Sequence, residues 1–567
     1  MAPPQVTPPR YLIPETYAGD PNGNISGYYG QFCYDSVAGE WYVGRSEPYG
    51  DVWDNISAAG YVGVQVFYVG KHGDDANDGL SEGTAFLTIG AAIAAANALT
   101  PTDVLHFIIH VIDGGRYSET FALPDYTVIY APGAHIYGGI TDNGVNSAIK
   151  ANIIEGSSGN DAIILASANS TWIHAERIYS ADDMAISITA AATAYITSDY
   201  VANNNVNNPA LSVTGDAIVN INFQYLFSLG NVFIESAIHI NSASANVYGF
   251  CGHIVCNNGA GENSCVAVTL GNCDLVIDKC TGFYYCVYVK GGTATVNINE
   301  VVINAQSSTV LRASGGTINA IVNKCNYGQY VALAEASSYI YCEIGYAVDQ
   351  HLGGLWSGAT ARSWAGGIID IKIGTVKFYD FFMEVQGAGG IINVIANKVE
   401  CLSTLANNTG FLVSVGICYA EINHLDINGS TPWNVLNSGE LYGKINTITN
   451  YGANAPTTTA ETYINVKRDS GIVTQAAVGP HDAYDVFGID TIIADTNANN
   501  VTFGGFINGQ NGQKINIIKT NVNNNLVVEH AEATGNQDVY IEGSGDKTIV
   551  DYGNLQLVCN FTSWFGS

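Results

Sequence analysis

The sequence predicts an all-β fold, a right-handed parallel β-helix, and three observations support this prediction. The chain has 567 residues, of which 63 are glycine and only 3 are methionine. Such a composition favours turn-rich β structure over helix. A short apolar pattern recurs through the middle of the chain at intervals of 20 to 28 residues. A second alternating run follows most copies of the pattern, so each repeat contains at least two short strands.

The recurring pattern is five residues long, with apolar residues at its second and fourth positions. The copies begin at residues 162, 185, 210, 237, 265, 286, 310 and 330, and the second runs include those at 217, 294, 367, 390 and 441. Strand side chains alternate between two faces, and a unit this short buries its apolar face only by stacking on its neighbours. Because the interval varies, a leucine-rich repeat or a propeller is disfavoured, and we expect a β-helix over residues 101–480.

A lead-in strand and a capping helix are expected over residues 66–100, ahead of the repeats. Thr88 is a plausible N-cap. The residues at helical spacing behind it are Ile89, Ala92, Ile93 and Ala96. A helix here would cover the first turn of the solenoid. The segment resembles the opening of many β-helix proteins, in which a glycine- and aspartate-rich turn precedes such a helix. The matching turn residues are Gly73, Asp75, Asn77, Asp78 and Gly79.

The N-terminal region divides into an arm and a small module. Residues 1–14 contain five prolines and predict an extended arm. Residues 15–65 predict a small β module that is similar to the hairpin near the N-terminus of phage and large-virus fibre proteins. The matching residues are Gly30, Gln31, Tyr34, Asp35, Trp41, Tyr42, Val43 and Trp53.

Residues 481–567 predict a C-terminal, sandwich-like β domain for trimerisation or receptor binding. The segment resembles the compact domain that closes many viral tail fibres and spikes, in which a G-x-x-G-Q turn precedes an apolar strand and a tryptophan lies near the end. The matching residues are Gly509, Gly512, Gln513, Ile515, Ile517, Leu555, Leu557, Val558, Asn560 and Trp564.

Together these features resemble a viral tail fibre or tailspike, from a bacteriophage or a large DNA virus. The resemblance implies a homotrimer, attachment to other virion proteins through the N-terminal arm, and binding to a host-surface glycan. It also implies assembly in the host cytoplasm and a final location in the virion. The formal charge of 20 − 50 = −30 disfavours nucleic acid as a partner, and a neutral glycan is easier to accommodate than an acidic one. No apolar stretch is long enough to predict membrane insertion.

Tailspike relatives often cleave polysaccharide with two carboxylates about 5 to 9 Å apart, so outward-facing columns were searched for such a pair. The third positions of the pentads are Ser187, Ser212, His239, Ala267, Tyr288, Arg312 and Ala332, with Glu384 in a later run. The second-strand column is Asn220, Val276, Asn297, Asp370, Asn393, Glu421 and Lys444. In it, Asp370 and Glu421 are expected two turns apart, at about 10 Å. Asp380 and Glu384 are further candidates, because the aromatic residues around them could desolvate a carboxyl and raise its pKa.

Asp370 and Glu421 can be explained as solvated polar residues on a sheet face, and Asp380 and Glu384 as neighbours of aromatic core residues. We therefore predict no catalytic residue. A role beyond structure stays open for all four carboxylates. No cofactor and no metal is expected. Cys251 with Cys256, and Cys273 with Cys280, lack the spacing of zinc ligands. The twelve cysteines are expected to be buried thiols.

The leading hypothesis is a non-enzymatic virion fibre or spike that attaches to a host-surface glycan. One alternative adds depolymerase activity, as a glycoside hydrolase or a polysaccharide lyase. Another is a secreted β-helix adhesin or pectinolytic enzyme, which is disfavoured because the N-terminus does not read as a secretory signal.

Overall fold

The computed structural model of the chain is all-β, as the sequence predicts. The structure describes residues 15–21, 32–38, 40–44, 53–55, 64–103, 105–205, 207–229, 236–256, 263–282, 284–302, 308–349, 359–402, 409–426, 431–449, 457–458, 463–467, 472–475, 481, 484–486, 489–507, 509, 512–520, 522–530, 537–542, 545–560 and 563–566. The predicted arm, 1–14, and the motif residues Gly30 and Gln31 lie outside them. Two compact units are present, Met1–Ala305 with Thr317–Asn319, and Gln306–Gly316 with Ala320–Ser567. Within the described residues, every helix is too short or too polar to cross a membrane.

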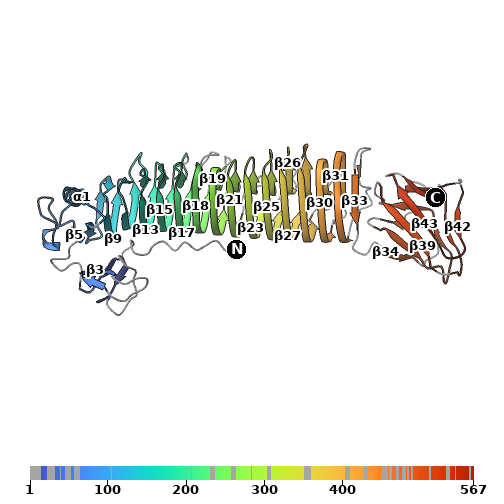
Figure 1. Ribbon diagram of the computed structural model, residues 1–567, viewed down its shortest axis with the longest axis horizontal. Coiled ribbons are helices and arrows are strands. Elements are labelled where there is room, and N and C mark those ends of the chain that lie inside the picture. Colours follow the sequence, from blue (N-terminus) through green and yellow to red (C-terminus); the bar gives the residue numbers. More distant parts are fainter. Residues whose placement is uncertain are drawn as a thin grey trace. The chain divides into compact units, whose positions relative to one another are not determined.

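The repeats form a parallel β-solenoid of about 15 turns, which confirms the predicted fold (Figure 1). Its strands are β5 (Val64–Val69), β6 (His106–Val111), β7 (Arg116–Ser118), β8 (Phe121–Leu123), β9 (Thr127–Tyr137), β10 (Ile140–Asp142), β11 (Ser147–Gly156), β12 (Ile163–Leu165), β13 (Ser170–Ser180), β14 (Ile186–Ile188), β15 (Thr193–Asn203), β16 (Leu211–Val213), β17 (Ile218–Ser228), β18 (Ile238–Cys256), β19 (Ser264–Thr281), β20 (Tyr285–Val289), β21 (Thr293–Val302), β22 (Thr309–Ala313), β23 (Thr317–Tyr327), β24 (Tyr330–Ala334), β25 (Tyr339–Asp349), β26 (Ala359–Trp364), β27 (Ile368–Phe378), β28 (Phe381–Gln386), β29 (Ile391–Cys401), β30 (Thr409–Asp426), β31 (Thr431–Thr449), β32 (Thr457–Thr458) and β33 (Tyr463–Lys467).

A typical turn contains a short strand followed by a long one, and each strand pairs with its counterpart in the next turn. Ile163 of β12 pairs with Ile186 of β14, an interval of 186 − 163 = 23 residues that equals the interval in the sequence pattern. The apolar side chains of the short strands alternate with outward ones, and Ile163 is fully buried. The stacked turns therefore share one continuous apolar interior in each unit. All twelve cysteines are buried, as expected.

The pairing register confirms the alignment of the first predicted column in one unit, although its residues there are buried rather than exposed, and corrects the alignment in the other unit. Ser187, Ser212, His239, Ala267 and Tyr288 pair in succession, as the pentads predict. In the second unit, however, Arg312 pairs with Leu333 rather than with Ala332. Ala332 pairs with Leu311 and is fully buried. Paired residues of β22 and β24 are 332 − 311 = 21 positions apart, one more than the spacing of the pentads. The residue in the column is therefore Leu333 and not Ala332.

The predicted capping helix is α1 (Ile89–Ala98), which packs against β5 and β6; a 3₁₀ turn, η2 (Glu82–Thr84), precedes it. The Thr88 hydroxyl accepts a hydrogen bond from the Ala91 amide at 3.1 Å, so Thr88 is the N-cap, as predicted. The buried face consists of the predicted residues Ile89, Ala92, Ile93 and Ala96.

The aspartate of the lead-in turn holds the start of this helix. The Asp75 carboxylate accepts hydrogen bonds from the amides of Leu87 and Thr88, each at 2.9 Å, and from the Thr88 hydroxyl at 3.0 Å. The Asn77 side chain donates to the carbonyl of Ala85 at 2.9 Å. The turn motif therefore positions the helix that covers the apolar side chains of the first turn.

The N-terminal module is a four-stranded sheet of β1 (Glu15–Tyr17), β2 (Phe32–Asp35), β3 (Glu40–Gly44) and β4 (Trp53–Asn55), in the order of the chain. Cys33 and Tyr42 are the buried residues of its apolar cluster in the described part. The Asp35 carboxylate accepts hydrogen bonds from the amides of Gly19, Val37 and Ala38. Of the matched motif, Asp35 thus stabilises the turn after β2.

The C-terminal strands form an eight-stranded sheet and a three-stranded sheet around one apolar core. The strands are β34 (Ile472–Gln475), β35 (Tyr484–Asp485), β36 (Thr491–Ala494), β37 (Val501–Phe503), β38 (Gly505–Ile507), β39 (Lys514–Lys519), β40 (Leu526–Val528), β41 (Gln537–Ile541), β42 (Lys547–Ile549), β43 (Gly553–Cys559) and β44 (Ser563–Gly566). Trp564 is fully buried, and a Cβ at Gly509 would lie 2.4 Å from its ring. The matched glycine and tryptophan are therefore in contact.

Replacing Asp75 by alanine should destabilise the first unit by about 1–3 kcal/mol, because two amides and a hydroxyl at the helix start lose their charged acceptor. Urea unfolding followed by circular dichroism measures the effect. The matched control is Asp74→Ala, since the Asp74 carboxylate accepts only the Ala76 amide among the hydrogen bonds described for it. Equal destabilisation by the two variants would contradict this role for Asp75.

Candidate functional site

The main candidate site is a groove of about 650 Å³ on the outer surface of the second unit. It crosses six successive turns, formed by β23, β25, β27, β29 and the long strands β30 and β31. Two columns of residues line it, one charged or apolar and one of asparagine and glycine. We call this feature the asparagine groove.

The groove exists because the long strands bend. In β25, β27 and β29, residues alternate inward and outward until two consecutive residues face outward, and alternation then resumes. Gly345 and Gly374 occupy the first of these two positions, and a Cβ at Gly374 would lie 2.4 Å from the Gly345 carbonyl oxygen. Glycine therefore permits the close approach of successive turns here, and the missing side chains leave the groove open.

The first column alternates in charge and is neutral as a whole. Pairing places Glu343, Lys372, Ile395, Glu421 and Lys444 in this order on successive turns. The Lys372 ammonium lies 2.9 Å from the Glu343 carboxylate. Two glutamates and two lysines give 2 − 2 = 0, in contrast to the formal charge of −30 on the chain.

The second column carries a ladder of side-chain amides. The Asn423 amide donates to the Asn397 carbonyl oxygen at 3.0 Å, and the Asn446 amide donates to that of Asn423 at 3.2 Å. A carboxamide has two N–H donors and two acceptor lone pairs, and the ladder engages one of each at Asn423. The amide therefore retains capacity for a polar ligand. The sequence signal for this ladder is a recurring asparagine in the second runs, which lies outside the columns predicted from the sequence.

Tyrosines flank the groove on the neighbouring column. Tyr419 and Tyr442 stack at 5.1 Å between ring centroids, with an interplanar angle of 17°. Tyr419 is 45% exposed, so its ring offers a flat apolar surface beside the polar groove. Tyr341 lies in the same column and receives a hydrogen bond from the Lys372 ammonium at 3.1 Å.

The structure does not bring the predicted carboxylates Asp370 and Glu421 into one column. Asp370 pairs with Asn393, which pairs with Tyr419, whereas Glu421 pairs with Ile395. The column predicted from the sequence mixed residues from two neighbouring columns, which lie two residues apart along each strand. The Asp370 carboxylate instead accepts hydrogen bonds from the Tyr339 hydroxyl and the Asn393 amide.

Asp380 and Glu384 are also separated, because Asp380 follows β27 in a turn and Glu384 lies on β28. The side chain of Glu384 is only 2% exposed, and the Arg362 guanidinium lies 3.5 Å from its carboxylate. The Gln386 amide donates to the same carboxylate at 2.5 Å. Arg362 in turn lies 4.7 Å from the ring centroid of Trp364, an exposed residue.

Burial raises the pKa of Glu384, and the positive charge of Arg362 and the hydrogen bond from Gln386 oppose that rise. The direction agrees with the expectation from the sequence, but the desolvated carboxyl pairs with an arginine rather than with a second carboxyl. In the groove, hydrogen bonds from Tyr341 and Lys372 lower the pKa of Glu343. Glu343 is thus held in its charged form and is unsuited to act as a general acid.

The groove is therefore better suited to binding than to proton transfer. It combines amides, paired charges and an exposed tyrosine, which are groups that bind polar ligands with flat apolar faces. Hydrolysis of a glycan would require a protonated carboxyl opposite a second carboxyl, and the described carboxylates of the groove do not form such a pair.

Comparison with protein-family models finds no match, and the comparisons with curated proteins and with solved structures likewise find none.

Glu384→Gln and Glu343→Gln should change the pH dependence of stability in opposite directions. The raised pKa of Glu384 means that wild-type protein loses stability as the pH rises from 4.5 through the folded pKa, and Glu384→Gln lacks that loss. The lowered pKa of Glu343 contributes stability above pH 4.5 that disappears as the pH falls through the folded pKa. Urea midpoints between pH 3 and 8, compared with wild type, measure both trends. Parallel pH profiles for the two variants would contradict this assignment.

Proposed function

We propose that this chain is a structural fibre or spike protein of a virion, and that it attaches to a neutral glycan of the host surface through the asparagine groove. The observation that carries the glycan proposal is the groove itself, with its amide ladder, its balanced charges and the exposed Tyr419 beside it. The order of module, capping helix, solenoid and C-terminal strands supports the fibre proposal by its resemblance to viral fibres.

The periodicity of the groove fits a polymeric ligand. Successive turns of a β-solenoid are about 4.8 Å apart, so Asn397, Asn423 and Asn446 offer the same amide group at regular steps. A linear polysaccharide also repeats its hydroxyl groups along its length. Several weak contacts of one kind can then add along the groove, as they do in multivalent binding.

The charge balance favours an uncharged polymer. The chain carries a formal charge of −30, and an acidic polysaccharide approaching it would be repelled. Because the charges that line the groove sum to zero, the groove has no excess of positive charge to reverse this repulsion. Hydroxyl groups of a neutral glycan can instead donate to Glu421 and accept from the amides.

We further propose that the chain is a homotrimer, attached to other virion proteins by its N-terminal arm and assembled in the host cytoplasm, as in the proteins that its sequence resembles. Mass spectrometry of purified particles and sedimentation of the purified chain test these points. Recovery only from a secreted fraction would favour the adhesin or pectinolytic alternative instead.

Replacing Asn423 and Tyr419 together by alanine should weaken binding of purified protein to host-surface glycan by about tenfold or more, because the ladder and the aromatic surface are both lost. Binding to immobilised neutral polysaccharide measures the effect. The matched control is Asn523→Ala, since Asn523 forms a similar exposed amide ladder with Asn497 away from the groove. Unchanged binding by the double variant, with its fold intact, would overturn the groove as the attachment site.

Cleavage of the glycan is a second candidate function, favoured by one observation, the desolvated Glu384 whose partner Arg362 also lies against the exposed Trp364. If Glu384 donates a proton to a glycosidic oxygen, wild-type protein should release reducing ends or unsaturated products from host polysaccharide, and Glu384→Gln should reduce the rate at least a hundredfold. Product formation that is equal in the two proteins, or absent from both, would contradict cleavage at Glu384.

A further inference from the structure

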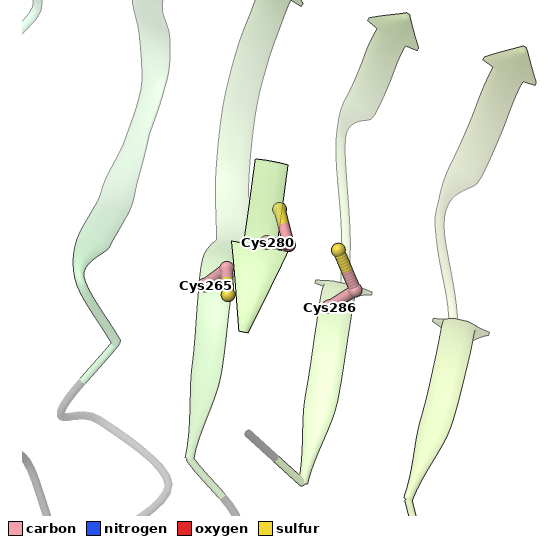
Figure 2. Close-up of side chains that lie close together, drawn as sticks. All are labelled: Cys265, Cys280 and Cys286. Atoms are coloured by element: carbon pink, nitrogen blue, oxygen red, sulfur yellow. The ribbon is translucent and has the colours of Figure 1, made fainter. Parts of the chain in front are cut away.

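Three buried cysteines meet in the interior of the first unit. The sulfur atoms of Cys265, Cys280 and Cys286 all lie within 4.8 Å of one another (Figure 2). All three side chains are fully buried. The sequence gives little sign of this cluster, because the residues are separated by intervals of 15 and 6 and belong to different parts of two turns.

The strand register explains how the three thiols converge. The pairs Ser264–Tyr285 and Val266–Val287 place Cys265 and Cys286 at equivalent positions of successive turns, on β19 and β20. Cys280 lies near the other end of β19, where it pairs with Ile254. It therefore reaches the cluster from a different side of the interior, as Figure 2 shows.

The arrangement is a triangle and not a simple stack. Stacking of like residues on successive turns places their side chains in a row. Three non-bonded sulfur atoms within 4.8 Å of one another cannot lie in a row, because neighbouring sulfurs would then be closer than their van der Waals radii allow. A triangle of sulfur atoms can present three ligands to a single ion.

A fourth thiol lies beside the triangle. The Cys256 thiol, near the end of β18, donates a hydrogen bond to the Ser264 carbonyl at 3.2 Å and also interacts with Cys265. Its side chain is buried as well.

We propose that Cys265, Cys280 and Cys286 bind one thiophilic metal ion, Zn²⁺ or a chemically similar cation, with Cys256 as the fourth ligand. Zinc in structural sites is held tetrahedrally by cysteine sulfur at about 2.3 Å, which sets sulfur–sulfur distances of about 3.8 Å. The observed triangle needs only a small contraction to meet this geometry. Such a site would join β18, β19 and β20 at one position in the interior.

Binding requires that each liganding thiol lose its proton to solvent, so four thiols and one Zn²⁺ give a tetrathiolate complex and four protons. Burial raises the pKa of Cys265 and Cys280 in the metal-free fold, so their thiols are protonated there. Because the sulfurs are enclosed, the ion would enter while the chain folds, when the cysteines are still accessible.

Refolding the full chain with Zn²⁺, removing loose metal with a weak chelator and measuring zinc by elemental analysis tests the proposal. One zinc per chain is expected. Refolding with Co²⁺ should produce the ultraviolet sulfur-to-cobalt charge-transfer band of a thiolate site. Wild-type protein that folds in the presence of Zn²⁺ yet retains no zinc and carries twelve titratable thiols, or that forms a disulfide within the cluster, would overturn the proposal.

Two variants and a control complete the experiment. Cys265→Ser should abolish the bound zinc, whereas Cys256→Ser keeps the triangle and should lose zinc to a chelator at least tenfold more readily than wild type. The matched control is Cys273→Ser, because Cys273 is buried on the same strand, β19, outside the triangle. Equal zinc content in wild type and Cys265→Ser would overturn the assignment of these ligands. If Cys265→Ser fails to fold, the zinc content of the wild-type protein still tests whether the chain binds the metal.

Discussion

Register between successive turns is the constraint on which the rest of this structure depends. Ile173, Ile196 and Ile221 pair in succession on β13, β15 and β17, and all three are buried. A shift of one residue would move each of them to the outer face and expose apolar surface to water. Because the inward residues are held in columns by this penalty, the outward residues are held in columns too. The surface of the solenoid is therefore as regular as its interior.

This regularity turns small local differences into extended features. Gly345 and Gly374 on successive turns open a groove, whereas a single glycine would leave only a notch. Asparagines at neighbouring turns form a ladder, and tyrosines at neighbouring turns form a stack. A repeated fold thus builds an elongated binding surface from side chains that would be unremarkable singly, which is why a polymer is the natural ligand to consider.

The same columns place polar and reactive groups in the interior or against it, where water cannot solvate them. Glu384 is tolerated because Arg362 and Gln386 surround its carboxylate. The thiols of Cys265, Cys280 and Cys286 converge in the interior, with the thiol of Cys256 beside them. In both cases a buried polar group has a partner on a neighbouring turn.

The sequence by itself determined the periodic fold and the capping helix, because alternation of apolar residues and an N-cap are local patterns. Only the tertiary structure decided which residues share a column. The pentads misplaced Ala332 by one position, and the second runs merged the columns of Asp370 and Glu421, since an extra residue or a bend shifts the register without altering the local pattern. The groove escaped prediction because it depends on contacts between turns that are 20 or more residues apart, and the thiol triangle because its members come from different parts of two turns.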